Sequence, residues 1–299
     1  MTFLSKQIPL LFLLTLMVAR LSGQTISSIH PIEDIQAHYA SLRALDDQPR
    51  KDFAWLDTIA YSPDLYRSGS LLYALMESHY LTATQVDFLI NSVQFPANSS
   101  VQTRAELDYL LDLQAKRTPE EVERVLDLAK VGYWPATNFV PDHNSYQKNL
   151  EHLFYEGRVV MGNDCTAANY PLTTKLLKGV MHDMRLMEFA VKYHLFRARP
   201  YYLEPQLEPL QIMGSPSFAS GHTLWAYIQA YTWSELIPTK RKAFVDLAFE
   251  IGHSREIMGV HYPSDEEAAR QLAHRMLWLM WHTEQFQQDF RAAQAEWEE

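Results

Sequence analysis

Residues 217–236 read Ser-Phe-Ala-Ser-Gly-His-Thr-Leu-Trp-Ala-Tyr-Ile-Gln-Ala-Tyr-Thr-Trp-Ser-Glu-Leu. The Ser-Gly pair near the start fits a tight turn, and the apolar side chains that follow recur with helical spacing. We therefore predict a helix that begins at about His222 and continues to residue 236. Backbone N–H groups at a helix N-terminus attract anions, and Ser220 could add a hydroxyl donor there.

Helical patterns continue on both sides of this stretch. They cover roughly residues 145–160, 172–198, 240–258 and 265–290, and two earlier ones follow Thr103-Arg104-Ala105-Glu106 and Thr118-Pro119-Glu120-Glu121. Both of these four-residue segments have the form of a capping box at a helix start. Alternating strand-like runs are nearly absent. We therefore predict an all-α fold, with residues 24–299 forming a single helical domain.

The composition is that of a globular protein with a large core. Of the 299 residues 47% are hydrophobic, and the net charge is −10. This acidic balance argues against nucleic acid as the main partner. It also gives no long-range attraction for an anionic substrate, so any affinity for phosphate must be local. The single cysteine, Cys165, excludes an intrachain disulfide, and we predict that it is buried.

The first 23 residues have the form of a secretory signal peptide. Lys6 is positively charged, residues 8–19 are largely apolar, and Ser22-Gly23 provides small residues for cleavage. The apolar run is short for a membrane span, and Arg20 interrupts it, so we expect cleavage rather than an uncleaved anchor. The sequence therefore predicts a secreted or periplasmic protein without stable membrane insertion after cleavage.

Three short clusters between residues 192 and 265 carry groups suited to chemistry on an oxyanion. They are Lys192-x6-Arg199-Pro200, then Ala219-Ser220-Gly221-His222, then Ser254-Arg255-x5-His261-x3-Asp265. Three fixed cations can neutralise the charge of a phosphate group. One histidine can act as nucleophile and the other as general acid. An aspartate four residues after a histidine can hold the ring in one tautomer and orientation.

Each cluster alone also has an ordinary interpretation. Lys192 and Arg199 are seven residues apart and could form a solvated basic stripe on one helix face, with Arg197 nearby. We expect Pro200 to end that helix just after Arg199. The segment around His222 could be no more than a capped helix start with a surface histidine.

The third cluster has a similar alternative. We expect Gly259 to end one helix and a capping box at Ser264-Asp265-Glu266-Glu267 to open the next, where Asp265 could serve only the helix dipole. The remaining histidines, His253 among them, fit no catalytic pattern. The segment 131–150, rich in Pro, Asn and aromatic residues, could be a loop over an active site or an ordinary surface connection.

In this order and at these spacings, the three clusters resemble the signature of the type 2 phosphatidic-acid phosphatase and vanadium haloperoxidase superfamily. That signature is Lys-x6-Arg-Pro, Pro-Ser-Gly-His and Ser-Arg-x5-His-x3-Asp. One position differs, because Ala219 stands where the family usually has proline, and this removes no chemical group. The segments 103–118 and 265–270 also resemble the bacterial class A non-specific acid phosphatases. The similarity covers about residues 100–280.

The resemblance implies a helical bundle of the acid phosphatase and haloperoxidase type and a role for each matched residue. Lys192, Arg199 and Arg255 would bind the phosphate oxygens, with hydrogen bonds from Ser220, the Gly221 backbone and Ser254. His261 would attack phosphorus while Asp265 orients its ring. His222 would protonate the leaving oxygen and then activate water. No metal is implied, and the sequence carries no His-Glu-x-x-His motif.

The sequence therefore predicts an exported, metal-independent acid phosphatase of broad substrate range. It would hydrolyse small phosphate monoesters through a phosphohistidine, without a cofactor, and would be inhibited by vanadate. We expect a bell-shaped pH profile on the acidic side of neutral.

Three alternatives stay open. A vanadium-dependent haloperoxidase would hold vanadate as cofactor in the same pocket. A soluble lipid-phosphate phosphatase would act on phosphatidic acid or a lipid pyrophosphate. A helical protein could also bind phosphate without turnover. A homo-oligomer built on exposed helical faces is compatible with the sequence.

Overall fold

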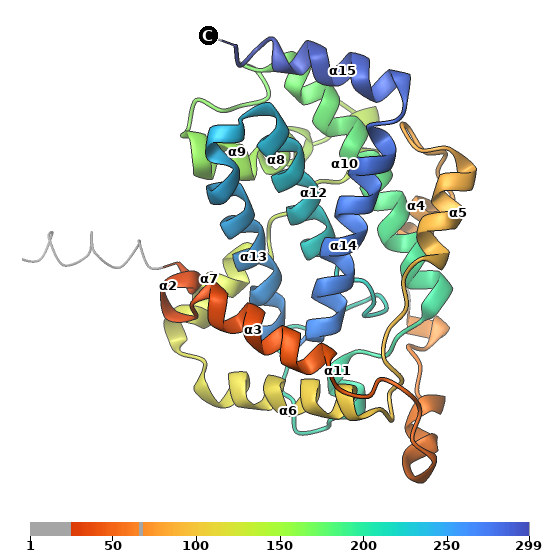
Figure 1. Cartoon of the computed structure of the whole chain (residues 1–299). Coiled ribbons are helices and arrows are strands. Elements are labelled where there is room, and N and C mark those ends of the chain that lie inside the picture. The colour runs from red at the N-terminus through yellow and green to blue at the C-terminus, as the bar shows by residue number, and fades with distance from the viewer. Residues whose placement is uncertain (1–24, 66–67, 299) are drawn as a thin grey trace, which may run out of the picture.

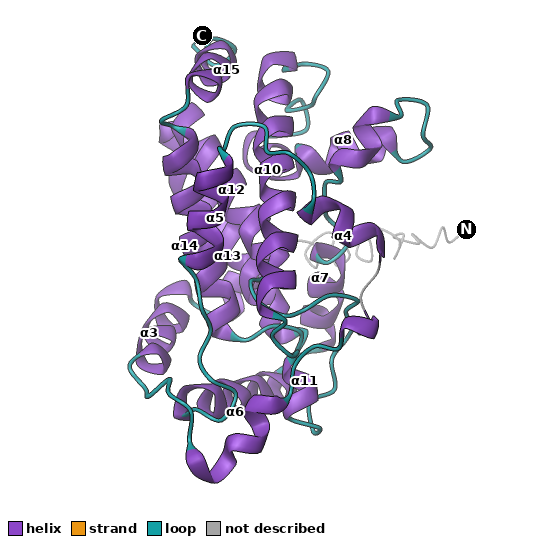
Figure 2. Cartoon of the chain, turned by 90° about the vertical axis from the view of Figure 1, so that its right-hand side faces the viewer, coloured by secondary structure: helices purple, strands orange, loops and turns teal. Residues whose placement is uncertain are grey.

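A computed structural model describes residues 25–65 and 68–298. Within these ranges the regular structure is helical, and the one isolated β-bridge joins Ala60 to Arg197 (Figure 2). The predicted all-α fold is confirmed. The predicted signal peptide, residues 1–23, lies outside the described residues.

The helices follow one another along the whole described chain. The α-helices are α2 (Ile26–Ile29), α3 (Ile32–Arg43), α4 (Ser68–Ala74), α5 (Ala83–Asn91), α6 (Val101–Lys116), α7 (Pro119–Leu128), α8 (Tyr146–Leu153), α9 (Tyr155–Met161), α10 (Pro171–Leu195), α11 (Pro200–Leu203), α12 (Gly221–Leu236), α13 (Arg241–Ile257), α14 (Pro263–Met280) and α15 (Glu284–Gln294). Short 3₁₀ helices are η1 (Lys51–Thr58), η2 (Pro63–Leu65), η3 (Pro135–Phe139) and η4 (Pro238–Lys240).

Helix α12 runs through the middle of the molecule between α13 and α14 (Figure 1). Its side chains are buried on nearly every face, including Trp225 and Trp233, as expected for a helix surrounded by others. Helix α10 lies alongside and packs against α4 and α15, while α6 crosses one end of the bundle (Figure 1). The main apolar core extends from Ile26 to Ala293, so the N-terminal segment without recognised motifs contributes to it.

Two of the predicted helices are each divided in the structure. The pattern over 145–160 is α8 and α9, which meet at Phe154, a buried residue with non-helical ψ. The pattern over 265–290 is α14 and α15. The turn between them directs α15 across α10 and buries Phe286 and Phe290, so core burial outweighs helix continuity there.

The predicted capping boxes have mixed outcomes. The one at Thr118 is confirmed, with Pro119 as the first helical residue. The one at Thr103 is wrong, because α6 begins earlier and the Ser100 hydroxyl accepts from the Thr103 N–H. The one at Ser264 is also wrong, because α14 begins at Pro263 and the Ser264 hydroxyl donates instead to Glu106 Oε2.

The predicted helix end at Pro200 is wrong as well. Helix α10 ends at Leu195, where Phe196 adopts a left-handed conformation with φ of 48°. Pro200 is instead the first residue of α11, a position where its missing N–H costs nothing. Lys192 therefore lies on α10, while Arg199 lies in the connection that follows and not on the same helix face.

Cys165 is buried, as predicted, and burial raises the pKa of its thiol to about 12. In the described part of the chain, the helices are all too short or too polar to span a bilayer.

Candidate active site

One cavity of about 270 Å³ gathers residues from all three sequence clusters. Its wall includes Lys192, Arg199, Gly221, His222, Arg255 and His261. Three other predicted site residues do not line it. The Ser220 hydroxyl turns into α12 and lies 3.0 Å from Thr223 Oγ1, and the Ser254 hydroxyl donates to the Ile251 carbonyl. Asp265 lies behind His261.

Backbone carbonyls hold two of the cations in place. Lys192 Nζ donates to the Pro216 carbonyl at 2.8 Å. The Arg199 guanidinium donates to the carbonyls of Ser215 at 3.0 Å and Val260 at 2.8 Å. The loop before α12 and the turn after α13 are therefore tied to these side chains. Hydrogen bonds to neutral carbonyl groups fix the orientation of the Lys192 and Arg199 side chains but do not neutralise their positive charge.

Arg255 lies in the last turn of α13 and is also buried. Its Nε has no hydrogen-bond partner, and its closest side-chain contact is the Met258 sulfur. Within the described ranges Lys192, Arg199 and Arg255 form no ion pair with a carboxylate. Burying three cations without acid partners lowers the stability of the fold unless an anion binds between them.

Desolvation weakens the charged form of these groups in the empty site. Burial and then the neighbouring Arg199 lower the pKa of Lys192 to about 7. Burial likewise lowers the pKa of Arg255 to about 10. A bound dianion would reverse both effects, because an opposite charge favours the protonated form. The site is therefore electrostatically complementary to phosphate or a similar oxyanion.

The N-terminus of α12 forms one wall of the cavity. Ser220 caps the helix, and Gly221 is its first residue. A Cβ atom at Gly221 would overlap the Glu188 carboxylate, so the close approach of α10 and α12 requires glycine here. Glu188 is itself paired with Arg185 at 2.5 Å. The Ser220 hydroxyl accepts from the Thr223 N–H, and the helix dipole favours an anion near Gly221 in the cavity wall.

His261 follows directly after the turn that ends α13, where Gly259 has φ of +70°, as the sequence predicts. Its Nε2 lies 2.9 Å from Arg199 Nη1, and its Nδ1 lies 3.0 Å from Asp265 Oδ2. A guanidinium can only donate, so Nε2 accepts and Nδ1 carries the proton that Asp265 accepts. The ring is therefore neutral, and its Nε2 lone pair accepts from Arg199 at the edge of the cavity.

The protonation states of this pair agree with that tautomer. Burial and then Arg199 hold the pKa of His261 well below its usual range, although Asp265 opposes them. Burial alone would raise the pKa of Asp265, but Arg197 and hydrogen bonds from His261 and Ser217 outweigh it and hold that pKa well below its usual value. Asp265 is thus an ionised acceptor behind a neutral imidazole.

Arg197 is the residue that the sequence patterns missed. It looked like part of a solvated stripe, but its side chain is only 1% exposed. Its Nη1 lies 2.6 Å from Asp265 Oδ1, and its guanidinium stacks on the Tyr262 ring at 3.8 Å. Helical spacing gave no signal, because Arg197 lies beyond the end of α10. The one sequence signal that distinguishes Arg197 from other arginines is its place in the segment Arg197-x-Arg199-Pro200.

His222 lies in the first turn of α12. Its Nε2 is 3.3 Å from the carbonyl oxygen of Ala129, which can only accept, so this nitrogen carries the proton. Burial, followed by Arg255 and Arg185, holds the pKa of His222 well below its usual range. Both cavity histidines are therefore neutral near pH 7 before an anion binds.

The segment 131–150 contributes only its first residues to the cavity. Gly132 and Trp134 line it, and Trp134 lies against Arg185, with the guanidinium carbon 4.1 Å from the ring centre. Residues 141–145 are exposed. The described residues contain no group of three or more His, Cys, Asp or Glu side chains arranged to hold a metal ion.

Comparison with known proteins agrees with the resemblance drawn from the sequence. Residues 170–289, which contain all three clusters, match the family model of the PAP2 superfamily, and the resemblance is confirmed. A non-specific acid phosphatase of Providencia stuartii is 24% identical over 220 residues, covering 67% of this chain and 89% of that protein. A second one, from Salmonella typhimurium, is 30% identical over 131 residues, covering 41% of this chain and 50% of that protein.

Two solved structures are similar in fold. One is a transmembrane PAP2-type phosphatidylglycerolphosphate phosphatase from Bacillus subtilis, with a TM-score of 0.41 and 19% identity over 71% of this chain and 92% of that one. The other is a bacterial vanadium-dependent iodoperoxidase, with a TM-score of 0.42 and 15% identity over 62% of this chain and 50% of that one.

Proposed function

We propose that this chain is a phosphatase of the acid phosphatase type, which hydrolyses small phosphate monoesters through a phosphohistidine at His261. The PAP2 match and the two acid phosphatase relatives support phosphatase activity. The proposal of a phosphohistidine at His261 rests on one observation. Three buried cations without acid partners among the described residues lie around a neutral imidazole, and its Nε2 lone pair, which accepts from Arg199 in the empty site, would turn to phosphorus once Arg199 binds the phosphate oxygens.

In the first step the His261 Nε2 lone pair attacks phosphorus. The P–N bond forms as the P–O bond to the alcohol breaks, and His222, which has gained a second proton on binding of the phosphate dianion, gives one proton to the leaving oxygen and becomes neutral. Lys192, Arg199 and Arg255 stabilise the charge on the other phosphate oxygens throughout. As His261 becomes positively charged, the ionised Asp265 stabilises the Nδ1–H side of the ring.

In the second step water attacks phosphorus on the side that the alcohol has left. His222, now lacking one proton, accepts a proton from that water as the P–N bond breaks. The cations stabilise the phosphate oxygens until phosphate dissociates, and His261 returns to its neutral tautomer. The cycle needs no metal, because fixed side-chain charges supply the electrostatic stabilisation.

The pH dependence follows from the opposite states required of the two histidines. His261 must be neutral to attack, and His222 must hold an extra proton if it is to donate to a poor leaving group. A bound phosphate dianion raises the pKa of His222, the group whose pKa the empty site holds low. We therefore propose maximal activity below neutral pH.

Export, metal independence and broad substrate range belong to the same proposal. Export rests on residues 1–23 and is tested by determining the N-terminus of the protein recovered from the exported fraction. A mature start near residue 24 is expected. Full-length protein that stays with the cell would contradict export without affecting the proposed chemistry.

The activity test is hydrolysis of p-nitrophenyl phosphate from pH 4 to 9 in the presence of EDTA. We expect wild-type activity that survives EDTA and is inhibited by vanadate. His261→Ala should lose it by at least about 10³-fold. His274→Ala is the matched control, because this histidine is exposed and lines neither of the cavities around His261 and Glu266.

Two results would contradict the proposal. One is His261→Ala that turns over as fast as His274→Ala. The other is wild-type protein that is inactive on phosphate esters but oxidises iodide or bromide with vanadate and peroxide, which would identify a haloperoxidase.

A further inference from the structure

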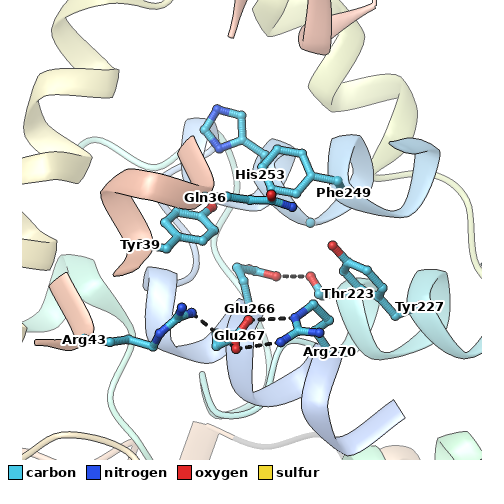
Figure 3. Close-up of a pocket in the computed structure, with 11 residues that line it drawn as sticks. Gln36, Tyr39, Arg43, Thr223, Tyr227, Phe249, His253, Glu266, Glu267 and Arg270 are labelled. Carbon is cyan, nitrogen blue, oxygen red and sulfur yellow. Dashed lines mark hydrogen bonds and ion pairs between the residues drawn. The ribbon is translucent and has the colours of Figure 1, made fainter. Parts of the chain in front are cut away.

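A second cavity, of about 310 Å³, lies between α3, α12, α13 and α14. It shares no lining residue with the first cavity. Figure 3 shows Tyr39 and Tyr227 on opposite sides of Glu266, with Phe249 completing an aromatic wall. A half-open cavity with aromatic walls and a central carboxyl group has the form of a small-molecule site.

Two buried polar atoms at this cavity have no partner in the described part of the chain. Glu266 is 4% exposed, and its Oε2 contacts the Thr223 hydroxyl while its Oε1 contacts no donor. His253 is 2% exposed and lies 2.8 Å from Glu256 Oε2 through its Nδ1. Its Nε2 is unpartnered. Because the carboxylate accepts from Nδ1–H, Nε2 presents a lone pair.

The charges around this cavity are unevenly paired. Glu267 binds both nearby arginines, Arg270 at 2.7 Å and Arg43 at 3.2 Å, along one side of the cavity in Figure 3. Glu256 and Glu266 have no Lys or Arg partner among the described ion pairs. Two arginines thus face three carboxyl groups, so the unmatched charge here is negative when Glu266 is ionised.

We propose that this second cavity binds a small alkylammonium ion. Its N–H groups donate to the carboxylate of Glu266. Its alkyl carbons pack between the rings of Tyr39, Tyr227 and Phe249, whose faces also attract a cation. The ligand supplies both the missing hydrogen-bond donors and the missing positive charge.

Binding also displaces a proton to solvent. In the empty cavity burial, with Glu256 and Asp265, holds the pKa of Glu266 well above its usual range, so its carboxyl group is protonated. The ammonium ion takes the place of that proton, and affinity therefore rises with pH. The charged and titratable groups around Glu266 are Tyr39 and Arg43 from α3, Lys192 from α10, Tyr227 from α12, His253, Arg255 and Glu256 from α13, and Asp265, Glu267 and Arg270 from α14.

Titration calorimetry on the full chain tests this proposal directly. The probe is n-butylammonium chloride at pH 6 and pH 8, compared with n-butanol and sodium butyrate. We expect saturable binding of butylammonium, tighter at pH 8, and at least tenfold weaker binding of both other probes. Glu266→Gln keeps the shape of the protonated side chain and should weaken butylammonium binding at least tenfold. Glu284→Gln, at an exposed first-turn position of α15, should bind like the wild type.

Phe249→Leu provides a second variant in case Glu266→Gln does not fold. It removes one aromatic face and should weaken butylammonium several-fold, whereas Tyr227→Phe keeps the ring and should not. Butanol binding as tightly as butylammonium, or butyrate binding more tightly, would overturn the proposal. So would the absence of binding, or unchanged affinity in Glu266→Gln. Phosphatase turnover enters none of these readouts, so failure here is independent of the proposed function.

Discussion

Two buried carboxylate–histidine pairs lie in neighbouring parts of this molecule and differ in what surrounds them. Asp265 accepts from Nδ1 of His261, and Glu256 accepts from Nδ1 of His253. The first carboxylate is also held by Arg197, and the cavity beyond its histidine is lined by three cations without a carboxylate partner among the described residues, Lys192, Arg199 and Arg255. The second carboxylate is held by the Tyr39 hydroxyl, and its cavity contains the unmatched Glu266.

The contrast shows that the pair itself does not define a catalytic site. Both carboxylates fix a histidine tautomer and leave Nε2 with a lone pair. Surplus positive charge makes the first cavity a site for an oxyanion that Nε2 can attack. The second cavity gains surplus negative charge only when Glu266 loses its proton, and the proposed cation would take the place of that proton. We therefore infer that the charges around each carboxylate–histidine pair determine whether its cavity supports a reaction or only ligand binding.

The largest expected difference between the two pairs is the loss of kcat when Asp265 or Glu256 is replaced by its neutral amide. Asp265→Asn should lower kcat for p-nitrophenyl phosphate by about 10³- to 10⁴-fold, because the amide can present N–H to Nδ1 and reverse the tautomer. Glu256→Gln should lower kcat by less than about tenfold and appear instead as lost stability of about 1–3 kcal/mol in urea unfolding. Equal losses of kcat in the two variants would remove the distinction between the pairs.

The next largest effect concerns Arg197, which acts on the reaction through Asp265. Arg197→Met leaves a buried carboxylate unpaired and should cost about 3–5 kcal/mol of stability. The pKa of Asp265 should rise, because its main counter-charge is gone. Asp265 then becomes protonated at higher pH, so the acid limb of the kcat profile should move to higher pH.

Arg197→Lys restores a charge and is the control for that experiment. It should recover part of the stability and return the acid limb toward the wild-type position. A variant that loses stability but keeps the wild-type pH profile would mean that Arg197 only packs the core.

The two cavities should also respond to pH in opposite directions. Sulfate, whose own charge is constant between pH 4 and 9, raises the pKa of His222, which the empty site holds low. Binding therefore takes up a proton, and sulfate affinity should rise as pH falls, by up to about tenfold per pH unit. Butylammonium releases the proton of Glu266, so its affinity should rise as pH rises. Calorimetry of both ligands at pH 5, 6.5 and 8 checks the two signs, and the same sign for both would contradict the comparison.

The smallest expected effect lies at the wall of the first cavity. Trp134 lines it, much as Phe249 lines the second. Trp134→Ala should raise KM for p-nitrophenyl phosphate by about three- to tenfold through lost ring contact, with a smaller change for glycerol phosphate. An equal rise for both substrates would place the effect on phosphate binding rather than on the leaving group.

Local signals in the sequence predicted much of this structure. The helix expected from His222 to residue 236 is found within one residue, because Ser220 caps it and its apolar spacing is regular. The end of α13 at Gly259 was also predictable, since the left-handed turn there favours glycine. The three sequence clusters also contain the residues that meet at the first cavity, namely Lys192, Arg199, Gly221, His222, Arg255 and His261.

Tertiary contacts decided what the sequence could not. Ser264 and Glu266 were expected only as members of a capping box, but α6 supplies Glu106 to the first, and α3 covers the cavity around the second. Arg197 resembled any surface arginine until Asp265, far along the chain, became its partner. Burial of a charged side chain depends on which elements pack over it, and helical spacing does not report that.

The most direct test of the central claim is to trap the covalent intermediate. We would mix His222→Ala with p-nitrophenyl phosphate, whose leaving group needs little protonation, quench the mixture at alkaline pH and locate the phosphoryl group by peptide mass spectrometry. We expect one phosphoryl group on His261, because the attacking nitrogen is intact while water activation is lost. Rapid turnover with no phosphoryl group on His261, or a phosphoryl group on another residue, would contradict it.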